Sequence, residues 1–143
     1  MAKQRVLFLC TGNSARSQMA EAFLRHYADA QFEVHSAGLE PKGINPYTIR
    51  VMDEVGIDIR HQTSDSVRKY MGVTHFTYAI TVCSAADKNC PHALWSRGTK
   101  LHWPFDDPAA VEGTDEEKLA KFRDVRDQIA AKIQSWIAER ETV

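Results

Sequence analysis

A short apolar run followed at once by a Cys-x5-Arg loop and a helical pattern is the feature that most restricts the fold of this chain. Residues 6–9 form the apolar strand, residues 10–16 form the loop, and a helix is predicted to open at Ser17. Such a loop directs backbone N–H groups, together with the positive end of the helix dipole, toward one point where a tetrahedral oxyanion can bind. The sequence therefore predicts an anion-binding loop with the thiol of Cys10 at its floor.

The residue types in this loop suit that task. Gly12 and Asn13 tolerate the left-handed backbone angles that a nest of N–H groups requires. The planar guanidinium of Arg16 can hold two anion oxygens at once. The same positive groups would stabilise a thiolate at Cys10, and the Ser17 hydroxyl is expected both to cap the helix and to hydrogen-bond the sulfur. The predicted oxyanion-binding residues are Thr11, Gly12, Asn13, Ser14, Ala15, Arg16 and Ser17.

Strand-like and helical patterns alternate along the whole chain. Strands are predicted at 6–9, 32–36, 76–82 and 100–103, and helices at 17–29, 46–55, 64–71 and from a capping box at 114–117 to about residue 137. This alternation predicts an α/β fold, with an open parallel sheet of about four strands flanked by helices on both faces, in a single domain over residues 1–143. Ligand sites in such sheets lie at the carboxyl ends of the strands, where Cys10, Cys83 and Asp107 all occur.

Composition restricts the partners and the compartment. The 18 basic and 19 acidic residues give a net charge of −1, so the chain lacks the basic surplus of nucleic-acid-binding proteins. The first apolar segment is too short for a signal peptide or a membrane span, so we expect a cytoplasmic protein. We also expect it to be a monomer. In a reducing compartment the three cysteines indicate thiol chemistry or metal binding, in preference to structural disulfides.

The Cys10–Ser17 motif, together with Asp107-Pro108 before the last helix, resembles the low-molecular-weight tyrosine phosphatases over essentially the whole chain. Within that superfamily, two further segments are similar to the thioredoxin-coupled arsenate reductases: residues 83–91, which begin Cys83-Ser84 and contain Cys90, and residues 105–109. Three separated motifs in one order make this resemblance specific.

The resemblance implies a role for each of these residues, with arsenate as substrate, thioredoxin as partner and no cofactor. Cys10 would attack arsenate and Asp107 would protonate the departing oxygen. Cys83 would then attack Cys10 and release arsenite, and Cys90 would attack Cys83 to leave a disulfide for thioredoxin. Asp106 competes with Asp107 as the acid, but Pro108 favours an extended, well-aimed backbone at Asp107.

The spacing of the second and third cysteines predicts a conformational change. Seven residues of helix span about 10.5 Å, whereas a disulfide needs Cα atoms within roughly 7 Å. If residues 83–90 are helical in the reduced protein, they must unwind when Cys83 and Cys90 join. We therefore predict a refolding switch over residues 83–97.

Other functions compete with arsenate reduction. A phosphatase acting on phosphotyrosine or small aryl phosphates would use the same Cys10, Arg16 and Asp107, and residual phosphatase activity is expected from the shared geometry. Ala109, however, replaces the aromatic residue that usually stacks on a tyrosyl ring in that family. A reductase drawing on glutaredoxin or a small thiol would not need both Cys83 and Cys90, and an oxyanion sensor would be indifferent to the loss of Cys90.

Structural or metal-binding roles are alternatives for the cysteines and for several polar residues. Cys83 and Cys90 could be inert core thiols, or zinc ligands with His92 and His102, but the spacing fits zinc poorly and no metal is expected there. Four polar residues either brace the anion loop by hydrogen bonds, hold a monovalent cation, or act as ordinary caps and turns. These are Asn13, Glu21, Ser36 and Asp65.

Overall fold

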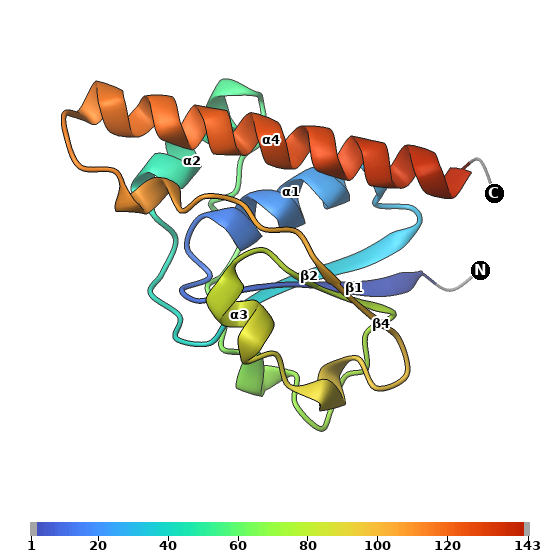
Figure 1. Cartoon of the computed structure of the whole chain (residues 1–143). Coiled ribbons are helices and arrows are strands. Elements are labelled where there is room, and N and C mark those ends of the chain that lie inside the picture. Colours follow the sequence, from blue (N-terminus) through green and yellow to red (C-terminus); the bar gives the residue numbers. More distant parts are fainter. Residues whose placement is uncertain (1–2, 142–143) are drawn as a thin grey trace.

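One parallel sheet lies at the centre of the computed structural model, which describes residues 3–141 (Figure 1). Its strands are β1 (Gln4–Cys10), β2 (Phe32–Gly38), β3 (Tyr78–Thr81) and β4 (Thr99–His102), in the order β2-β1-β3-β4. The predicted open parallel sheet of four strands is confirmed. The third strand is shorter than expected, because the Phe76 N–H bonds to the Leu94 carbonyl instead of extending the ladder.

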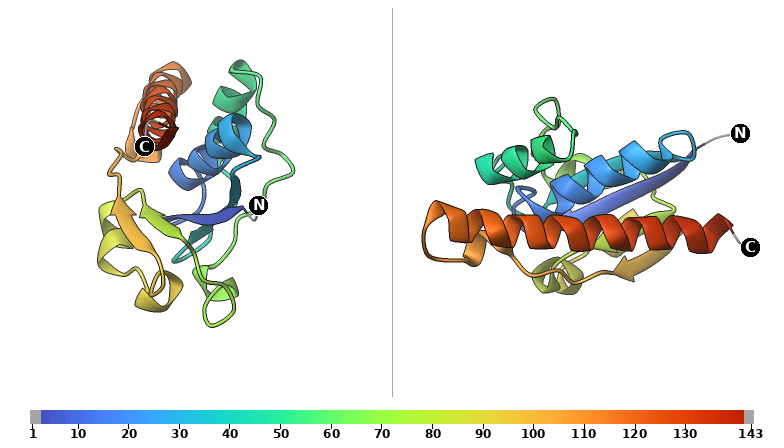
Figure 2. Two further views of the ribbon diagram at one scale, coloured as in Figure 1. Left: turned by 90° about the vertical axis from the view of Figure 1, so that its right-hand side faces the viewer. Right: turned by 90° about the horizontal axis from the view of Figure 1, so that it is seen from above.

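Helices cover both faces of this sheet (Figure 2). The helices α1 (Arg16–Ala28), α2 (Pro46–Glu54) and α4 (Asp115–Glu141) lie on one face, and the short α3 (Ser84–Lys88) lies on the other. Three single turns of 3₁₀ helix complete the fold: η1 (Val67–Lys69), η2 (His92–Leu94) and η3 (Pro108–Ala110). Since β2 and β3 flank β1, the chain reverses its direction of travel across the sheet at β1, and a crevice at the carboxyl ends of β1 and β3 follows.

Local sequence signals explain where the longer helices begin. The Asn45 side chain accepts a hydrogen bond from the N–H of Tyr47 and caps α2, with Pro46 in the first turn. At α4 the Thr114 and Glu117 side chains bond each other's backbone N–H groups, as the predicted capping box requires.

The helix predicted at residues 64–71 is wrong, because only the turn η1 forms there. The backbone of Asp65 is engaged elsewhere: its N–H donates to the Asn13 side chain and its carbonyl accepts from the Gly38 N–H. Those bonds tie the segment to the anion loop and keep it extended until Ser66, which caps η1.

The core lies between the sheet and the α1, α2 and α4 layer. The four residues of β1 from Val6 to Leu9 are fully buried, which is why that strand reads as a continuous apolar run. On α4 the predicted apolar stripe is buried at every position except Ile137, which is half-buried. Over residues 3–141 no helix combines the length and apolarity that crossing a bilayer demands.

An ion-pair cluster fastens α2 to α4 and gives a pH-dependent prediction. Glu54 accepts from Arg123 Nη2 at 2.7 Å and from Arg126 Nη1 at 2.8 Å, and these hydrogen bonds, the Arg123 bond foremost, lower the pKa of Glu54 to about 2. A Glu54→Gln variant should lose about 1 kcal/mol of unfolding free energy at pH 7, since the cluster is partly exposed to solvent.

The sign of the pH dependence follows from the lowered pKa. The stabilisation is fully present above the ordinary glutamate pKa of about 4.3 and disappears as the pH falls toward 2. Urea unfolding of the unmodified protein and of Glu54→Gln between pH 2 and pH 7 should therefore show that their difference in unfolding free energy shrinks as the pH falls. A difference that stays constant over this range would contradict the assignment.

Candidate functional site

The thiol of Cys10 lies at the floor of a pocket formed where β1 ends and α1 begins. Its side chain is only 3% exposed, and its sulfur accepts from the Asn13 backbone N–H at 3.1 Å. Ser17 Oγ lies 2.8 Å from the sulfur and accepts from Asn13 Nδ2, so the serine hydrogen is left to donate to Cys10. Both hydrogen bonds direct the positive ends of polar groups at this sulfur, the candidate nucleophile.

Two details of the predicted loop are corrected by the structure. Ser17 does not cap α1, because its hydroxyl is committed to the Cys10 sulfur; the helix begins at Arg16, and its N-cap, Ala15, makes no side-chain cap bond. Gly12 is not left-handed either. Within the loop that conformation belongs to Asn13, with a φ of 46°, whereas a Cβ on Gly12 would meet only the side chains of Lys42 and Ser14 at ordinary contact distances.

The loop is held open by bonds to its outer side. The carbonyl groups of Thr11, Gly12 and Ser14 accept backbone N–H bonds from residues 40, 42 and 45 respectively, at 2.8–3.1 Å. With these carbonyls turned outward, the planar peptide units direct N–H groups of the loop toward the pocket. This is the arrangement that an oxyanion requires.

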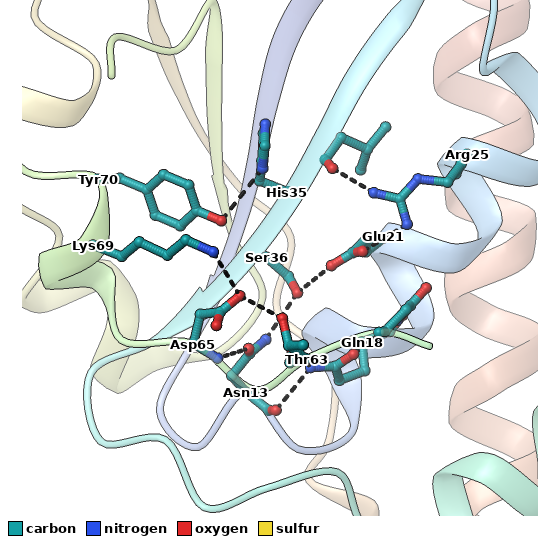
Figure 3. A network of polar contacts seen from close by, with 12 residues as sticks. Asn13, Gln18, Glu21, Arg25, His35, Ser36, Thr63, Asp65, Lys69 and Tyr70 are labelled. Atoms are coloured by element: carbon teal, nitrogen blue, oxygen red, sulfur yellow. Dashed lines mark hydrogen bonds and ion pairs between the residues drawn. The ribbon is translucent and has the colours of Figure 1, made fainter. Parts of the chain in front are cut away.

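Asn13 is the centre of the polar network behind the loop (Figure 3). Its Nδ2 donates to Ser17 Oγ and, at 2.9 Å, to Ser36 Oγ, while its Oδ1 accepts from the backbone N–H of Asp65 at 2.8 Å. Ser36 in turn donates to Glu21. Because Asn13 is completely buried and its amide uses both ends, its left-handed backbone is fixed by its surroundings.

The four residues considered for loop bracing or cation binding thus lie together in this network. Glu21 is paired with Arg25 at 2.7 Å, and Asp65 is paired with Lys69 at 3.5 Å. These two side chains already bring positive charge to both carboxylates. In the described part of the chain, no three His, Cys, Asp or Glu side chains are grouped so that they could hold a metal ion.

The pocket above Cys10 has a volume of about 280 Å³, enough for a small tetrahedral anion with its water. It is bounded by the anion loop, by the segment after β2 and by the turn that begins η3. The lining residues are Cys10, Thr11, Gly12, Ser14, Ala15, Arg16, Lys42, Asp107 and Ala109.

Arg16 joins the anion loop to the loop that carries the candidate acid. Its Nη1 donates to the Phe105 carbonyl at 3.0 Å, and its Nη2 lies 3.9 Å from Asp107 Oδ2. Asp107 has an extended backbone, as the following Pro108 predicts, and its Oδ1 accepts from the Ala109 N–H. The competing carboxylate, on Asp106, does not line the pocket, because it pairs with Lys121 at 2.9 Å.

Cys83 lies beside the anion loop, at the end of β3. Its sulfur is 3.5 Å from Thr11 Oγ1 and accepts from the N–H of Ala86 at 3.4 Å, so it also caps α3. Cys83 is buried and Cys90 is half-buried beyond the C-terminal end of α3, and all three cysteines are free thiols. Burial raises the pKa of the Cys90 thiol.

Two contributors to the site escaped the sequence analysis. Lys42 lines the pocket mouth from a loop with no motif, and the Phe105 carbonyl that receives Arg16 carries no side-chain signal at all. The His102 side chain, weighed as a zinc ligand, instead lies 2.8 Å from Thr81 Oγ1.

Comparison with known proteins agrees with this geometry. The family described as low molecular weight phosphotyrosine protein phosphatase matches residues 5–142. The chain belongs to this family. The match covers nearly the whole chain, and it includes the Cys10 loop, Arg16 and Asp107.

Several relatives within the phosphatase family are arsenate reductases. The chain is 46% identical to the arsenate reductase of Halalkalibacterium halodurans, over 95% of this chain and 96% of the relative. A solved structure of an arsenate reductase in the oxidized state has a TM-score of 0.80 at 32% identity, covering 95% of this chain and 98% of that one. A thioredoxin-dependent arsenate reductase of Corynebacterium glutamicum has a TM-score of 0.61 at 27% identity, covering 92% and 62% respectively.

Gly38 is the position at which this phosphatase-family site needs a glycine. A Cβ there would lie 2.7 Å from the Thr11 carbonyl oxygen and 2.8 Å from the Asn13 nitrogen, both backbone atoms of the anion loop. A Gly38→Ala variant should therefore displace the loop and weaken the binding of inorganic phosphate about tenfold, measured by calorimetry. Gly12→Ala, whose added methyl meets the Lys42 and Ser14 side chains only at ordinary contact distances, should weaken phosphate binding much less. Equal losses in the two variants would contradict the steric argument.

Proposed function

We propose that this chain reduces arsenate to arsenite, with Cys10 as the nucleophile and with electrons passing from thioredoxin through Cys90 and Cys83 to arsenate. The observation that carries the proposal is the second thiol next to the anion loop, with Cys83 Sγ 3.5 Å from Thr11 Oγ1. A phosphatase has no use for a thiol there. The arsenate reductases among the relatives and the thioredoxin-dependent neighbour support the proposal.

The first half of the reaction takes place in the pocket. Arsenate binds to the loop N–H groups and the Arg16 guanidinium, and the Cys10 thiolate displaces one arsenate oxygen, which Asp107 protonates so that it leaves as water. Cys83 then attacks the Cys10 sulfur. The electron pair of the arsenic–sulfur bond passes to arsenic, As(V) becomes As(III), and arsenite leaves behind a Cys10–Cys83 disulfide.

The second half carries the disulfide outward. The Cys90 thiol loses its proton and attacks the Cys83 sulfur, and Cys10 departs as a thiolate. The resulting Cys83–Cys90 disulfide is then reduced by thioredoxin, with Cys90 the more accessible of the two sulfurs. We further propose that the protein acts as a cytoplasmic monomer.

The electron donor is the point at which the rival reductase differs. Arsenate-dependent NADPH oxidation should be sustained by thioredoxin with its reductase, and not by glutaredoxin with glutathione or by small thiols alone. A Cys83→Ser variant should lose the steady rate. A rate that survives this change, or equal rates with all donors, would reject the relay in favour of a single-thiol reductase.

A phosphatase activity is the second candidate, because the pocket places Cys10, Arg16 and Asp107 around one anion site. Ala109 lines this pocket with a methyl group, so a tyrosyl ring gains no aromatic partner at that position. We therefore propose only slow hydrolysis of aryl phosphates. If the protein turned over p-nitrophenyl phosphate faster than arsenate, phosphatase activity would be its main function and arsenate reduction the minor one.

The refolding of residues 83–97 stays a prediction, but its starting state is in place. Residues 84–88 form helix α3, with Cys83 and Asn89 as its caps. Because Cys83 caps one end of that helix and Cys90 follows the cap at the other end, we expect α3 to unwind before the two sulfurs can join. Hydrogen exchange over 83–97 should accelerate on oxidation, and identical exchange in the two redox states would refute the switch.

A further inference from the structure

A second polar cluster lies under α3, outside the oxyanion pocket. The Asp87 carboxylate accepts from Lys100 Nζ at 2.6 Å and from Thr81 Oγ1 at 3.1 Å, and Lys100 Nζ also donates to the Asp87 carbonyl at 3.1 Å. His102 Nδ1 lies 3.7 Å from the same carboxylate oxygen. The last turn of α3 is therefore fastened to β3 and β4 through both the side chain and the backbone of one residue.

These contacts lie across the path of the proposed relay. Asp87 stands between Cys83 and Cys90, on the helix that must unwind before those sulfurs can meet. Lys100 and His102, in contrast, belong to β4, which is hydrogen-bonded into the sheet. Unwinding therefore pulls Asp87 away and leaves Lys100 in place without its carboxylate.

The charges around Cys90 indicate how Lys100 affects this thiol once Asp87 has moved away. Burial raises the pKa of the Cys90 thiol, and the negative charge of Asp87 raises it further, whereas the positive charge of Lys100 lowers it. The positive charge of Lys100 thus acts on Cys90, and the negative charge of Asp87 opposes it.

We propose that Asp87 is a positioning residue of the relay: it fastens α3 and occupies Lys100 while the protein is reduced, and its departure turns the Lys100 charge toward Cys90. This inference rests on the proposed function. In the step concerned, Cys90 gives its proton to solvent, a bond forms between the Cys90 and Cys83 sulfurs, and the Cys10–Cys83 bond breaks with Cys10 leaving as a thiolate. The Lys100 ammonium stabilises the attacking sulfur, so Cys90 becomes a nucleophile only when α3 opens.

Two substitutions separate this role from simple fastening. Asp87→Asn loosens α3 and frees Lys100, so Cys90 should exchange with the Cys10–Cys83 disulfide about threefold to tenfold faster, and its alkylation by iodoacetamide should begin at lower pH. Lys100→Met loosens α3 equally but removes the charge, so alkylation should begin at higher pH and exchange should be slower than in Asp87→Asn. Lys100→Arg keeps the charge and should resemble the unmodified protein.

The experiment is one arsenate turnover without thioredoxin, quenched at intervals and followed by mass spectrometry of the alkylated chain. The decay of the Cys10–Cys83 species into the Cys83–Cys90 species gives the exchange rate, and the pH profile of alkylation is measured on the reduced protein. Asp53→Asn, which breaks an exposed ion pair with Arg60, is the matched control.

The outcomes distinguish the inference from the function on which it rests. The inference is supported if the pH profile of Cys90 alkylation moves to lower pH in Asp87→Asn and to higher pH in Lys100→Met. Displacements in the same direction, or an Asp87→Asn protein that matches the control in both rate and pH profile, overturn it while the relay stands. Absence of any Cys83–Cys90 species in the unmodified protein overturns the relay and the inference together.

Discussion

A Cys90→Ser variant is expected to form one arsenite per chain and then stop. Cys10 and Cys83 suffice to take one arsenate through its reduction, so the first turnover should proceed. The Cys10–Cys83 disulfide then has no internal thiol to resolve it. Cys10 and Cys83 are only 3% and 5% exposed in the reduced protein. We therefore expect thioredoxin to attack their disulfide poorly, in contrast to a disulfide that includes Cys90.

The measurement is arsenite released per chain, with thioredoxin, its reductase and NADPH in excess. Ser84→Ala, an exposed change on the same short helix, is the control and should turn over continuously. Mass spectrometry of the stalled variant should show a bond between positions 10 and 83. Repeated turnover by Cys90→Ser would show that the electron donor reaches Cys83 or Cys10 directly, and the three-cysteine relay would fail.

The parts of this molecule that the sequence predicts well are those determined by local patterns. The apolar run of β1, the Cys10–Arg16 loop, the Asn45 cap and the capping box at α4 each depend on residues adjacent in the chain, and the structure has them in place. The parallel pairing of β1 with β2 also follows from local patterns, because a short β-α-β connection forces a parallel crossover.

The features that the sequence does not reveal depend on contacts between distant segments. Ser17 has the residue type of a helix cap, yet the Cys10 sulfur takes its hydroxyl. Residues 64–66 have a helix-opening pattern, yet Asp65 is bound to Asn13, 52 residues away in the chain. In both cases the contacts of the anion loop compete with local preference and win, because a buried sulfur and a buried amide need those partners more than an exposed helix end does.

Arg16 shows how such long-range contacts serve the reaction. One nitrogen of its guanidinium donates to the Phe105 carbonyl and another approaches Asp107, so the residue that we propose to bind the anion also positions the loop of the proposed acid. The side chain is mostly buried, which restricts its orientation before the anion arrives. The distance between the nucleophile and the acid is thereby fixed through a third residue.

Replacement of Asp107 by Asn should slow the formation of arsenite in a single turnover by about 10²–10⁴-fold, the usual contribution of a positioned acid. The Asn side chain keeps an oxygen that can accept from the Ala109 N–H, so the turn η3 should persist. What disappears is the proton for the departing oxygen. Because the proposed role of Asp107 is to protonate the departing oxygen, the dissociation constant for inorganic phosphate should change little while the rate falls.

Asp106→Asn is the matched control, because it alters the neighbouring carboxylate by the same atoms. Asp106 pairs with Lys121 on α4 and does not line the pocket, so its loss should leave the single-turnover rate within about twofold of the unmodified protein. If the two variants were slowed equally, the acid would not be Asp107 and the loop as a whole would be the sensitive element. If Asp106→Asn alone were slow, the loop would have to rotate during catalysis so that Asp106 faces the departing oxygen. That rotation would break the hydrogen bond between Arg16 and the Phe105 carbonyl.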